Sequence, residues 1–459
     1  MRYISTRGAS PISDFDTVLT RALAPDGGLY VPQEWPDALP IEAFRGLSFD
    51  EIAARILMGF AGDAVSLKEA RGLTKAAYAT FRHEDVAPVV PFREKEHLLE
   101  LFHGPTLAFK DVAMQLIARL FERDLERRAG QMTVIVATSG DTGGAAVSAL
   151  AGRKNLRICS LHPHERISEV QRRFMTTSGQ GNVLNLAVEG TFDDCQSIVK
   201  DLFADRAFAD DVALGGVNSI NWMRIAAQVT YYITACLALP PVGPVHFSVP
   251  TGNFGDVYAG YVAKKLGAPI GKLIVAVNEN DILDRVLRTG SYEKLGVQPT
   301  EAPSMDIEVA SNFERLIFEA SGRDADLTAD LMSDLKKQGK FNISETLREV
   351  MTEQFLSYRA SAEDIEAQMK AAYEATGMLI DPHTAIGTHA AAEARKEGLQ
   401  GPIVTLATAH PAKFPQVVEK VTGHHPDLPF AATELFGQQE IFDICPNDID
   451  AVKQRMRPA

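Results

Sequence analysis

VATSGDTGGAA, residues 136–146, joins an apolar run directly to a glycine-rich turn and then to a helical pattern. The apolar run, Met132–Ala137, does not alternate with polar residues, as expected of a strand that is buried on both faces. VPTGNFGDVYAG, residues 249–260, repeats this order after the apolar run Val245–Val249. A strand, a tight turn and a helix in succession form part of a βαβ unit, so both stretches predict parallel sheet covered by helices.

Similar apolar runs recur along most of the chain. We predict strands at Leu98–Phe102, Met132–Ala137, Leu156–Leu161, Val183–Val188, Val245–Val249, Leu273–Val277 and Ile403–Ala407. A helical pattern follows most of these runs, which indicates an α/β fold built from repeated βαβ units. Residues 311–375 carry charged sequence with helical periodicity and few strand signals, and we expect a helical insertion there.

At 459 residues the chain is too long for one ordinary hydrophobic core. The patterns divide it into a small N-terminal domain, two α/β domains and a tail. We predict the N-terminal domain at 1–92, the larger α/β domain at 93–104 and 236–430, the smaller α/β domain at 105–235, and the C-terminal tail at 431–459. The larger domain would contain the helical insertion.

The composition is that of a globular protein, with 46% hydrophobic and 23% charged residues. A formal net charge of −14 disfavours nucleic acids and anionic membranes as partners. The four cysteines lie far apart without a CxxC pair, which favours a reducing compartment over a disulfide scaffold or a zinc site. Neither a signal-peptide pattern nor an apolar run long enough for a membrane span occurs. We therefore expect a cytoplasmic enzyme that acts on a small molecule without a metal.

HGPTLAFKD, residues 103–111, places a lysine where a positive charge is unfavourable. Lys110 follows a Gly-Pro turn and opens a helical pattern whose apolar positions begin at Val112. The positive end of a helix opposes a second cation and burial acts in the same direction, so the pKa of Lys110 should be lowered. A lysine that loses its proton readily is suited to covalent chemistry with an aldehyde. Taken alone, the motif is also compatible with an ordinary first-turn lysine.

The two glycine-rich turns present backbone N–H groups at a helix start, which favours an anion. Neither turn has the G-x-G-x-x-G spacing of a dinucleotide site. The second has the glycine spacing of a P-loop from Gly255 to Gly260, but Tyr261 and Val262 replace the required lysine and hydroxyl residue. A phosphate cradle remains, for which we predict Gly252, Asn253, Phe254 and Gly255. Asp256 should cap the helix that follows.

TAHPAKF, residues 408–414, follows the predicted strand Ile403–Ala407 and forms a third loop. Ligands of open α/β sheets bind at the carboxyl ends of strands, and all three loops occupy such ends. Thr408 is placed to form a hydrogen bond with a heteroaromatic nitrogen. A lysine for an aldehyde, a cradle for a phosphate and a partner for a ring nitrogen are the three contacts that pyridoxal 5'-phosphate needs.

With these motifs the chain resembles the threonine synthase family, pyridoxal-phosphate enzymes of fold type II, the group of the tryptophan synthase β subunit. The segments that carry the resemblance are HGPTLAFKD (103–111), ATSGDTGGAA (137–146), NSINWMRIAAQVTYY (218–232), VPTGNFGD (249–256) and TAHPAKF (408–414). STRG (5–8) and PDGGLYVP (25–32) are similar to the longer subgroup of the family. The resemblance implies two parallel-sheet α/β domains with a small N-terminal domain. It also implies a lyase of amino-acid biosynthesis that makes L-threonine and phosphate from O-phospho-L-homoserine and water.

The resemblance also implies roles for individual residues. Lys110 would hold the cofactor covalently and act as the catalytic base. The other cofactor-binding residues would be Asp141, Gly252, Asn253, Phe254, Gly255 and Thr408. The substrate carboxylate would be bound by Thr138, Ser139 and Thr142. The substrate phosphate needs several donors, and we expect them among Ser219, Asn221, Arg224, His410 and Lys413. Glu165 departs from the family, whose members usually have glycine there, and this puts a contribution from Arg166 in doubt.

Several alternatives remain open at this point. Within the same fold they are another pyridoxal-phosphate phospho-lyase and a hydroxyamino-acid dehydratase, which would not need a second phosphate pocket. A non-catalytic ligand-binding protein of this fold is an alternative of a different class. The polar stretch around Asn278–Asp281 lacks the spacing of a calcium loop, so we interpret it as a solvated loop. Both a monomer and a homodimer are compatible with the sequence.

Overall fold

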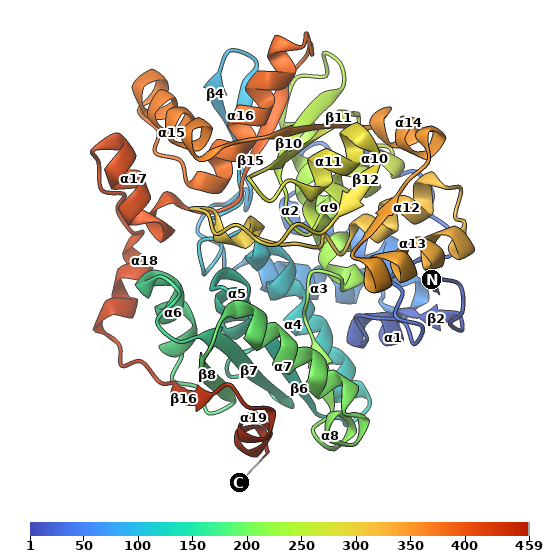
Figure 1. Cartoon of the computed structure of the whole chain (residues 1–459), viewed down its shortest axis with the longest axis vertical. Helices are drawn as coiled ribbons and strands as arrows, with labels where there is room; N and C mark the ends of the chain where they lie inside the picture. The colour runs from blue at the N-terminus through green and yellow to red at the C-terminus, as the bar shows by residue number, and fades with distance from the viewer. Residues whose placement is uncertain (458–459) are drawn as a thin grey trace.

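The computed structural model describes residues 1–457 and contains two main sheets, which lie one above the other in Figure 1. The larger sheet has the strand order β14-β11-β10-β15-β5-β4, and every neighbouring pair is parallel except β4 with β5. Its strands are β4 Val89–Arg93, β5 Glu96–Glu100, β10 Val245–Pro250, β11 Ile270–Val277, β14 Phe355–Arg359 and β15 Ile403–Ala407. The central strands β10 and β15 are buried throughout, because helices cover both faces of the sheet.

The smaller sheet has the strand order β16-β8-β7-β6-β9 and is parallel throughout. Its strands are β6 Met132–Ala137, β7 Leu156–Pro163, β8 Val183–Glu189, β9 Leu214–Gly216 and β16 Asp443–Pro446. The helices of this part of the chain are α4 Lys110–Arg127, α5 Asp141–Leu150, α6 Glu169–Thr176, α7 Phe192–Ala204, α8 Arg206–Asp211 and α9 Trp222–Ala238.

The helices between and after the larger-sheet strands are α10 Gly255–Lys265, α11 Ile282–Thr289, α12 Phe313–Ala320, α13 Ala325–Gln338, α14 Glu345–Thr352, α15 Ala362–Thr376, α16 Pro382–Lys396 and α17 Pro415–Thr422. A two-stranded ribbon, β12 Ser291–Glu293 and β13 Lys340–Asn342, lies beside α11. Two short 3-10 turns matter for the site, η3 Pro303–Met305 and η4 Pro411–Lys413.

The N-terminal segment forms a three-stranded sheet of β1 Arg2–Ser5, β2 Ser13–Asp14 and β3 Tyr30–Pro32, with helices α1 Phe15–Thr20, α2 Phe49–Ala61 and α3 Leu67–Tyr78. It packs on the start of α9, where the buried Trp222 ring contacts the rings of Tyr3 and Phe60. An ion pair of 2.8 Å between Arg7 and Glu314 joins it to α12. The N-terminal segment therefore packs against α9 and α12 and holds these helices in position.

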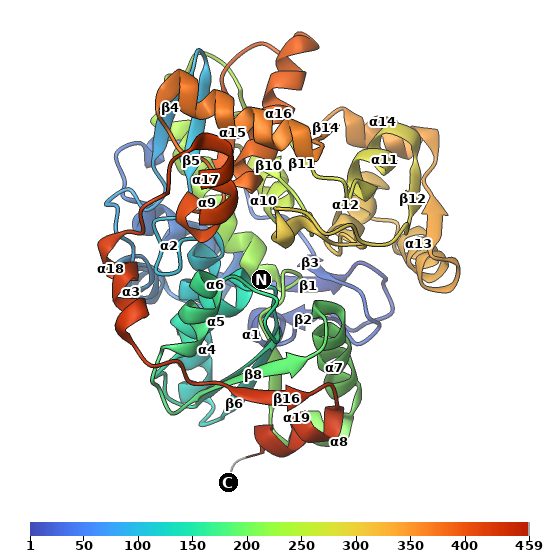
Figure 2. The same cartoon turned by 60° about the vertical axis from the view of Figure 1, so that its left-hand side comes forward.

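The C-terminal segment crosses from the larger sheet to the smaller one, as Figures 1 and 2 both show. After α17 the chain forms the short helix α18 Phe430–Thr433, strand β16 and helix α19 Ile449–Met456. Strand β16 pairs with β8, and Val452 and Met456 of α19 are buried in the core of the smaller sheet. Within the segment that the sequence analysis names a C-terminal tail, residues 443–456 thus form part of the smaller sheet and its core.

The predicted strands are all present, and Met132–Ala137 and Ile403–Ala407 have the predicted bounds. The region 311–375 is not purely helical, because β14 within it forms the edge of the larger sheet. The predicted boundary between the two α/β domains, at 235/236, falls within α9, and this helix packs on α10, α2 and α4. No helix within residues 1–457 has the length and apolarity needed to cross a membrane.

Candidate active site

Lys110 is the first residue of α4, as predicted, and its side chain is buried. The helix forms because its apolar positions recur at helical spacing and are buried against neighbouring helices. The Lys110 Nζ lies 3.3 Å from Asp141 Oδ2 and 3.3 Å from Ser304 Oγ. Burial lowers the pKa of Lys110 and the nearby charges of Lys413 and Arg224 lower it further, although Asp141 opposes them. Lys110 is therefore a poorly solvated amine that is easily deprotonated.

The backbone around Lys110 is fastened to the loop that follows β15. Phe109 N donates a hydrogen bond of 2.9 Å to Thr408 O, and Ala108 forms a bridge with Ala409. Lys413 Nζ donates to Thr106 O at 2.9 Å. The segments 103–111 and 408–414 are thus adjacent, with Lys110 and the buried Thr408 at the carboxyl end of the larger sheet.

Asp141 connects these loops to the smaller sheet. It begins α5 after β6, and its Oδ1 lies 2.6 Å from Lys413 Nζ and accepts from Gln171 Nε2 at 3.0 Å. Its Oδ2 faces Lys110 and accepts from Ser304 Oγ at 3.1 Å. Burial alone would raise the pKa of Asp141, but Lys413 and Lys110 hold it well below its ordinary value. The carboxylate is therefore charged between two lysines.

The second loop has the geometry of a phosphate cradle. Phe254, immediately before α10, has φ of 64°, which turns the backbone inward at the helix start. A Cβ on Gly252 would lie 3.1 Å from Ser304 O and 3.2 Å from Met305 Cα, so the η3 turn lies close against the loop. Among the described residues, the N–H groups of Gly252, Asn253 and Phe254 donate to no protein acceptor. Free N–H groups at a helix start suit an anion, and these residues fit the phosphate of the cofactor.

Asn312 joins the cradle to the loop before α9. Its fully buried amide donates to Ser219 O and to Asn253 O, each at 3.1 Å. Arg315, one helical turn further on, donates to Ile220 O at 2.7 Å. The sequence analysis did not single out Asn312, Ser304 or Gln171, because each lies in a segment without a recognisable motif and is brought to the site only by tertiary packing.

Arg224 is buried at the start of α9, close to the cradle. Its Nη1 donates to Val217 O at 3.2 Å, and its Nε has no partner within the described residues. Burial lowers the pKa of Arg224 to about 10, while Tyr231 and Asp256 act in the opposite direction. A buried guanidinium with an unused N–H is suited to bind an anion.

Asp256 does not cap α10, contrary to the expectation from sequence. The residue before the helix is Phe254, without a side-chain cap, whereas the buried Asp256 side chain accepts from the hydroxyls of Tyr231 and Tyr232. Burial raises its pKa to about 6, although both tyrosines and the nearby Arg224 act against this. Asp256 is the second residue of α10, and the left-handed Phe254 stands at the cap position before the helix.

The residues predicted to bind the substrate carboxylate lie together after β6. Thr138 Oγ1 accepts from Gly140 N and Gly143 N, each at 2.9 Å, so this hydroxyl fixes the turn. Ser139 and Thr142 flank Asp141 in sequence and are partly exposed. These two hydroxyl groups therefore border the side of the site that solvent reaches.

Two of the residues expected at the substrate phosphate form hydrogen bonds with the protein backbone. Asn221 is buried, with Nδ2 donating to Leu19 O and Oδ1 capping α9 through Met223 N. His410 Nδ1 accepts from Ala412 N, and burial lowers its pKa to about 4. Both side chains hold the backbone in this way, and their contact with the substrate phosphate stays a prediction. Ser219, partly exposed beside the cradle, remains at the site.

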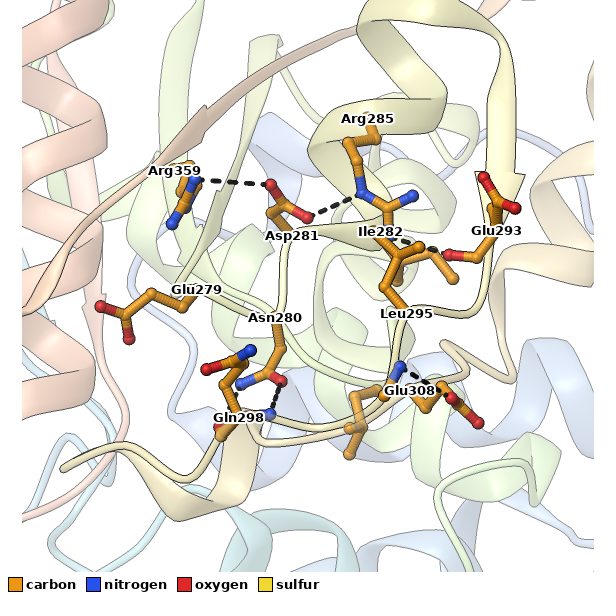
Figure 3. A pocket seen from close by; sticks show the side chains of 12 residues that line it. Glu279, Asn280, Asp281, Ile282, Arg285, Glu293, Leu295, Gln298, Glu308 and Arg359 are labelled. Carbon is orange, nitrogen blue, oxygen red and sulfur yellow. Dashed lines mark hydrogen bonds and ion pairs between the residues drawn. The ribbon is translucent and has the colours of Figure 1, made fainter. Parts of the chain in front are cut away.

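A separate polar cavity of about 220 Å³ lies at the ends of β11 and β14 (Figure 3). Asp281 in it lies 2.8 Å from Arg285 Nε and 3.8 Å from Arg359 Nη1. Glu308 accepts from Gly296 N, and Gln298 N donates to Asn280 Oδ1. Within residues 1–457 no group of acidic, histidine or cysteine side chains has the arrangement of a metal site. The cavity is a loop region of internally paired groups, away from Lys110.

The fold and this site together define a pyridoxal-phosphate-dependent enzyme of fold type II. Residues 95–334 match the model of the pyridoxal-phosphate dependent enzyme family. Residues 2–78 match the model of the threonine synthase N terminus, and residues 384–456 match that of the threonine synthase C-terminal region. The chain belongs to the threonine synthase family.

Relatives that cover the whole chain agree with this assignment. A threonine synthase of Pseudomonas aeruginosa is 45% identical over 99% of this chain and 97% of its own length. The crystal structure of a pyridoxal-phosphate-bound threonine synthase from Brucella melitensis is similar, with a TM-score of 0.96, 48% identity, and coverage of 99% and 98% of the two chains. That of threonine synthase from yeast has a TM-score of 0.93, 38% identity, and coverage of 99% and 97%. The enzyme is therefore a pyridoxal-phosphate-dependent lyase.

Proposed function

We propose that the protein converts O-phospho-L-homoserine and water to L-threonine and inorganic phosphate, the last step of threonine biosynthesis. The observation that carries this proposal is the buried Lys110, held against Asp141 and Ser304 beside a phosphate cradle. Full-length similarity to threonine synthases supports the choice of reaction. The same residues account for both cofactor binding and proton transfer.

Lys110 would hold the cofactor covalently, with its phosphate on the N–H groups of Gly252, Asn253, Phe254 and Gly255. Thr408 would face the ring nitrogen, and Asp141 the neighbouring ring oxygen. Bound pyridoxal phosphate supplies a conjugated ring that stabilises negative charge at the substrate Cα. A hydroxyl at the ring nitrogen, unlike a carboxylate, does not keep that nitrogen protonated, and this favours elimination over transamination.

Once the substrate amine has taken its place on the cofactor, Lys110 is free to move protons. Its Nζ would remove the Cα proton and serve the later transfers at Cβ and Cγ, because burial favours its neutral form. A proton would leave Cβ and phosphate would leave Cγ, and Cγ would then take up a proton to become the methyl group. Water would add a hydroxyl at Cβ, a proton would return to Cα, and the remaining proton of the water would leave with the phosphate. The net reaction exchanges the Cγ phosphate ester for a Cβ hydroxyl without oxidation or reduction.

The substrate has two anionic groups, and the site has donors for both. Ser139 and Thr142, with the turn fixed by Thr138, would bind the carboxylate. Arg224, with an unused buried N–H, and the neighbouring Ser219 would bind the leaving phosphate. These donors lie on loops that follow neighbouring strands of the smaller sheet, β6 and β9.

A product assay tests the proposal. The purified protein with pyridoxal phosphate is given phosphohomoserine and, separately, threonine, and the release of threonine, phosphate and 2-oxobutanoate is followed. The proposal expects threonine and phosphate in equal amounts from phosphohomoserine. 2-Oxobutanoate as the main product from threonine would identify a dehydratase instead, and phosphate release without threonine another phospho-lyase. A protein that binds the cofactor but forms none of these products would be a ligand-binding relative.

We also propose a cytoplasmic location, which is supported by the cysteines. All four, Cys159, Cys195, Cys236 and Cys445, are free and buried. Burial raises the pKa of the Cys236 thiol to about 12, so this thiol stays protonated and unreactive. Free buried thiols of this kind suit a reducing compartment. Fractionation of the native cells with an antibody against the protein would test the location.

A further inference from the structure

Lys413 lies inside the site, and its ammonium is paired with protein groups. It ends η4, directly after β15, and its side chain is only 1% exposed. Its ammonium lies 2.6 Å from Asp141 Oδ1 and donates to Thr106 O at 2.9 Å. Two of its three N–H bonds are thus committed to the protein, and Phe174 covers it at 5.5 Å from the ring centre. This geometry uses most of the ammonium's hydrogen-bonding capacity within the protein.

The two lysines occupy opposite oxygens of the same carboxylate. Lys413 and Gln171 face Asp141 Oδ1, whereas Lys110 and Ser304 face Asp141 Oδ2. This division fixes the plane of the carboxylate. It also leaves one oxygen directed at the amine that carries the chemistry. Lys413 therefore determines how Asp141 is presented to Lys110.

The charges of Lys110, Asp141 and Lys413 give Lys413 a second role. A buried carboxylate is costly unless a positive group accompanies it. Lys110 must be neutral during part of the reaction, and during that time it cannot balance Asp141. Lys413, which plays no covalent part, can balance this charge throughout.

We propose that Lys413 is a positioning residue that keeps Asp141 charged and directed at Lys110, so that Lys110 can give up its own proton. This inference rests on the proposed function only in taking Lys110 as the cofactor lysine. The charged groups near Lys110 come from four elements: Asp141 from α5, Lys413 from η4, Arg224 from α9 and Asp256 from α10. Without Lys413, Lys110 becomes the main counter-charge of Asp141 and holds its proton more firmly.

The test is the rate at which Lys110 of the full-length protein is captured by pyridoxal phosphate in the presence of cyanoborohydride. Cyanoborohydride reduces the carbon–nitrogen bond formed, and mass spectrometry of the Lys110 peptide gives the rate across a range of pH. Lys413→Met should slow capture about tenfold at neutral pH, because a shift of one pH unit in the titration of Lys110 reduces its neutral fraction tenfold. Capture at the wild-type rate would overturn the proposal, and an increased KM for phosphohomoserine alongside it would restore Lys413 as a substrate contact.

Lys264→Met is the matched control, because Lys264 also donates to a backbone carbonyl, Gly271 O, but forms no ion pair within the described residues. Its capture rate should equal that of the wild type, and a slowing equal to that of Lys413→Met would contradict a specific role. Adding Lys413→Met to an Asp141→Asn variant gives a second comparison, which tests the proposal even if Lys413→Met alone does not fold. There Lys413→Met should slow capture less than in the parent, because only the direct repulsion between the two lysines is lost, and an equal tenfold slowing would overturn the proposal. Wild-type protein that captures no cofactor on Lys110 would refute the proposed function itself.

Discussion

At the scale of single residues, the chemistry of Lys110 depends on burial more than on its place in the helix. The dipole of a helix disfavours a cation at its first turn by only about 0.3–1 kcal/mol. Burial is the largest of the causes that lower the pKa of Lys110, and the charges of Lys413 and Arg224 add to it. Asp141 limits the effect. The site therefore combines a buried amine, which loses its proton more readily than a solvated lysine does, with a carboxylate that holds the amine in position.

Glu165 offers a test of backbone strain at this scale. It is exposed in the turn after β7 and has φ of 57°, a region in which residues with a Cβ are strained. Glu165→Gly should raise the free energy of unfolding by about 0.5–1 kcal/mol, since the relief of strain exceeds the entropy cost of glycine. Denaturant unfolding measures the change. Glu301→Gly, at an exposed position without positive φ, should not stabilise, and a lower stability of Glu165→Gly would contradict the interpretation.

His162 makes the protein sensitive to acid. Its ring is buried near the end of β7, neither nitrogen has a well-formed hydrogen bond among the described residues, and burial lowers its pKa to about 4. In the unfolded chain histidine takes up a proton below about pH 6.5, so its contribution to stability is lost as the pH falls towards 4. His162→Phe should remove about 2 kcal/mol of the loss in stability between pH 7 and pH 5. Equal pH dependence of variant and wild type in thermal unfolding would refute this.

The sequence predicted those site residues whose role depends on local chain geometry. Lys110 and the Gly252–Gly255 turn could be found because a helix start and a glycine-rich turn are encoded by neighbouring residues. Ser304 and Gln171 could not, because their contacts to Asp141 span 163 and 30 residues of sequence. The pairing of Lys413 with Asp141 was missed for the same reason.

At the scale of elements, the site consists of loops clamped to one another by buried amides. Asn312 holds the loop before α9 and the cradle before α10 through two backbone carbonyls. Asn312→Ala should weaken pyridoxal-phosphate binding about tenfold, because the loss of such hydrogen bonds costs roughly 1–2 kcal/mol and loosens the cradle. Cofactor titration followed by fluorescence measures this.

Asn182 provides the matched control for Asn312. Its amide likewise donates to backbone carbonyls, Leu150 O at 2.9 Å, Leu156 O at 3.0 Å and Arg153 O at 3.5 Å, but it lies at the opposite end of β7 from the site. Asn182→Ala should lower stability while leaving cofactor affinity unchanged. If both variants weakened cofactor binding equally, the effect would reflect general loosening instead of the clamp.

Strands in the middle of the sheets were predictable, whereas edge strands were not. Runs such as Val245–Val249 are apolar on both faces because helices cover both sides of the sheet. Strands β14 and β16 carry polar and exposed residues, since one side of an edge strand meets solvent. Their sequences therefore lack the signal that identified the central strands.

At the scale of the whole molecule, the C-terminal segment ties the two sheets together. The chain leaves the larger sheet after β15, runs along the outside through α18, and completes the smaller sheet with β16 and α19, as Figure 2 shows. Val452→Asp would place an unpaired charge in the core of the smaller sheet, where Val452 is fully buried. We expect a loss of about 3–5 kcal/mol in stability and faster hydrogen exchange in β8.

Val350→Asp is the control for this change, because Val350 on α14 is 41% exposed. It should change stability by no more than about 0.5 kcal/mol. Equal effects of the two variants, or unchanged exchange in β8 for Val452→Asp, would show that the C-terminal segment contributes little to the smaller sheet.

The central claim is that one buried amine, Lys110, carries the cofactor. Borohydride reduction of the protein with bound pyridoxal phosphate, followed by mass spectrometry of its peptides, tests this most directly. We predict a single cofactor adduct, on the peptide that contains Lys110, and none in Lys110→Ala. An adduct on a different lysine, or an unchanged adduct in Lys110→Ala, would contradict the account.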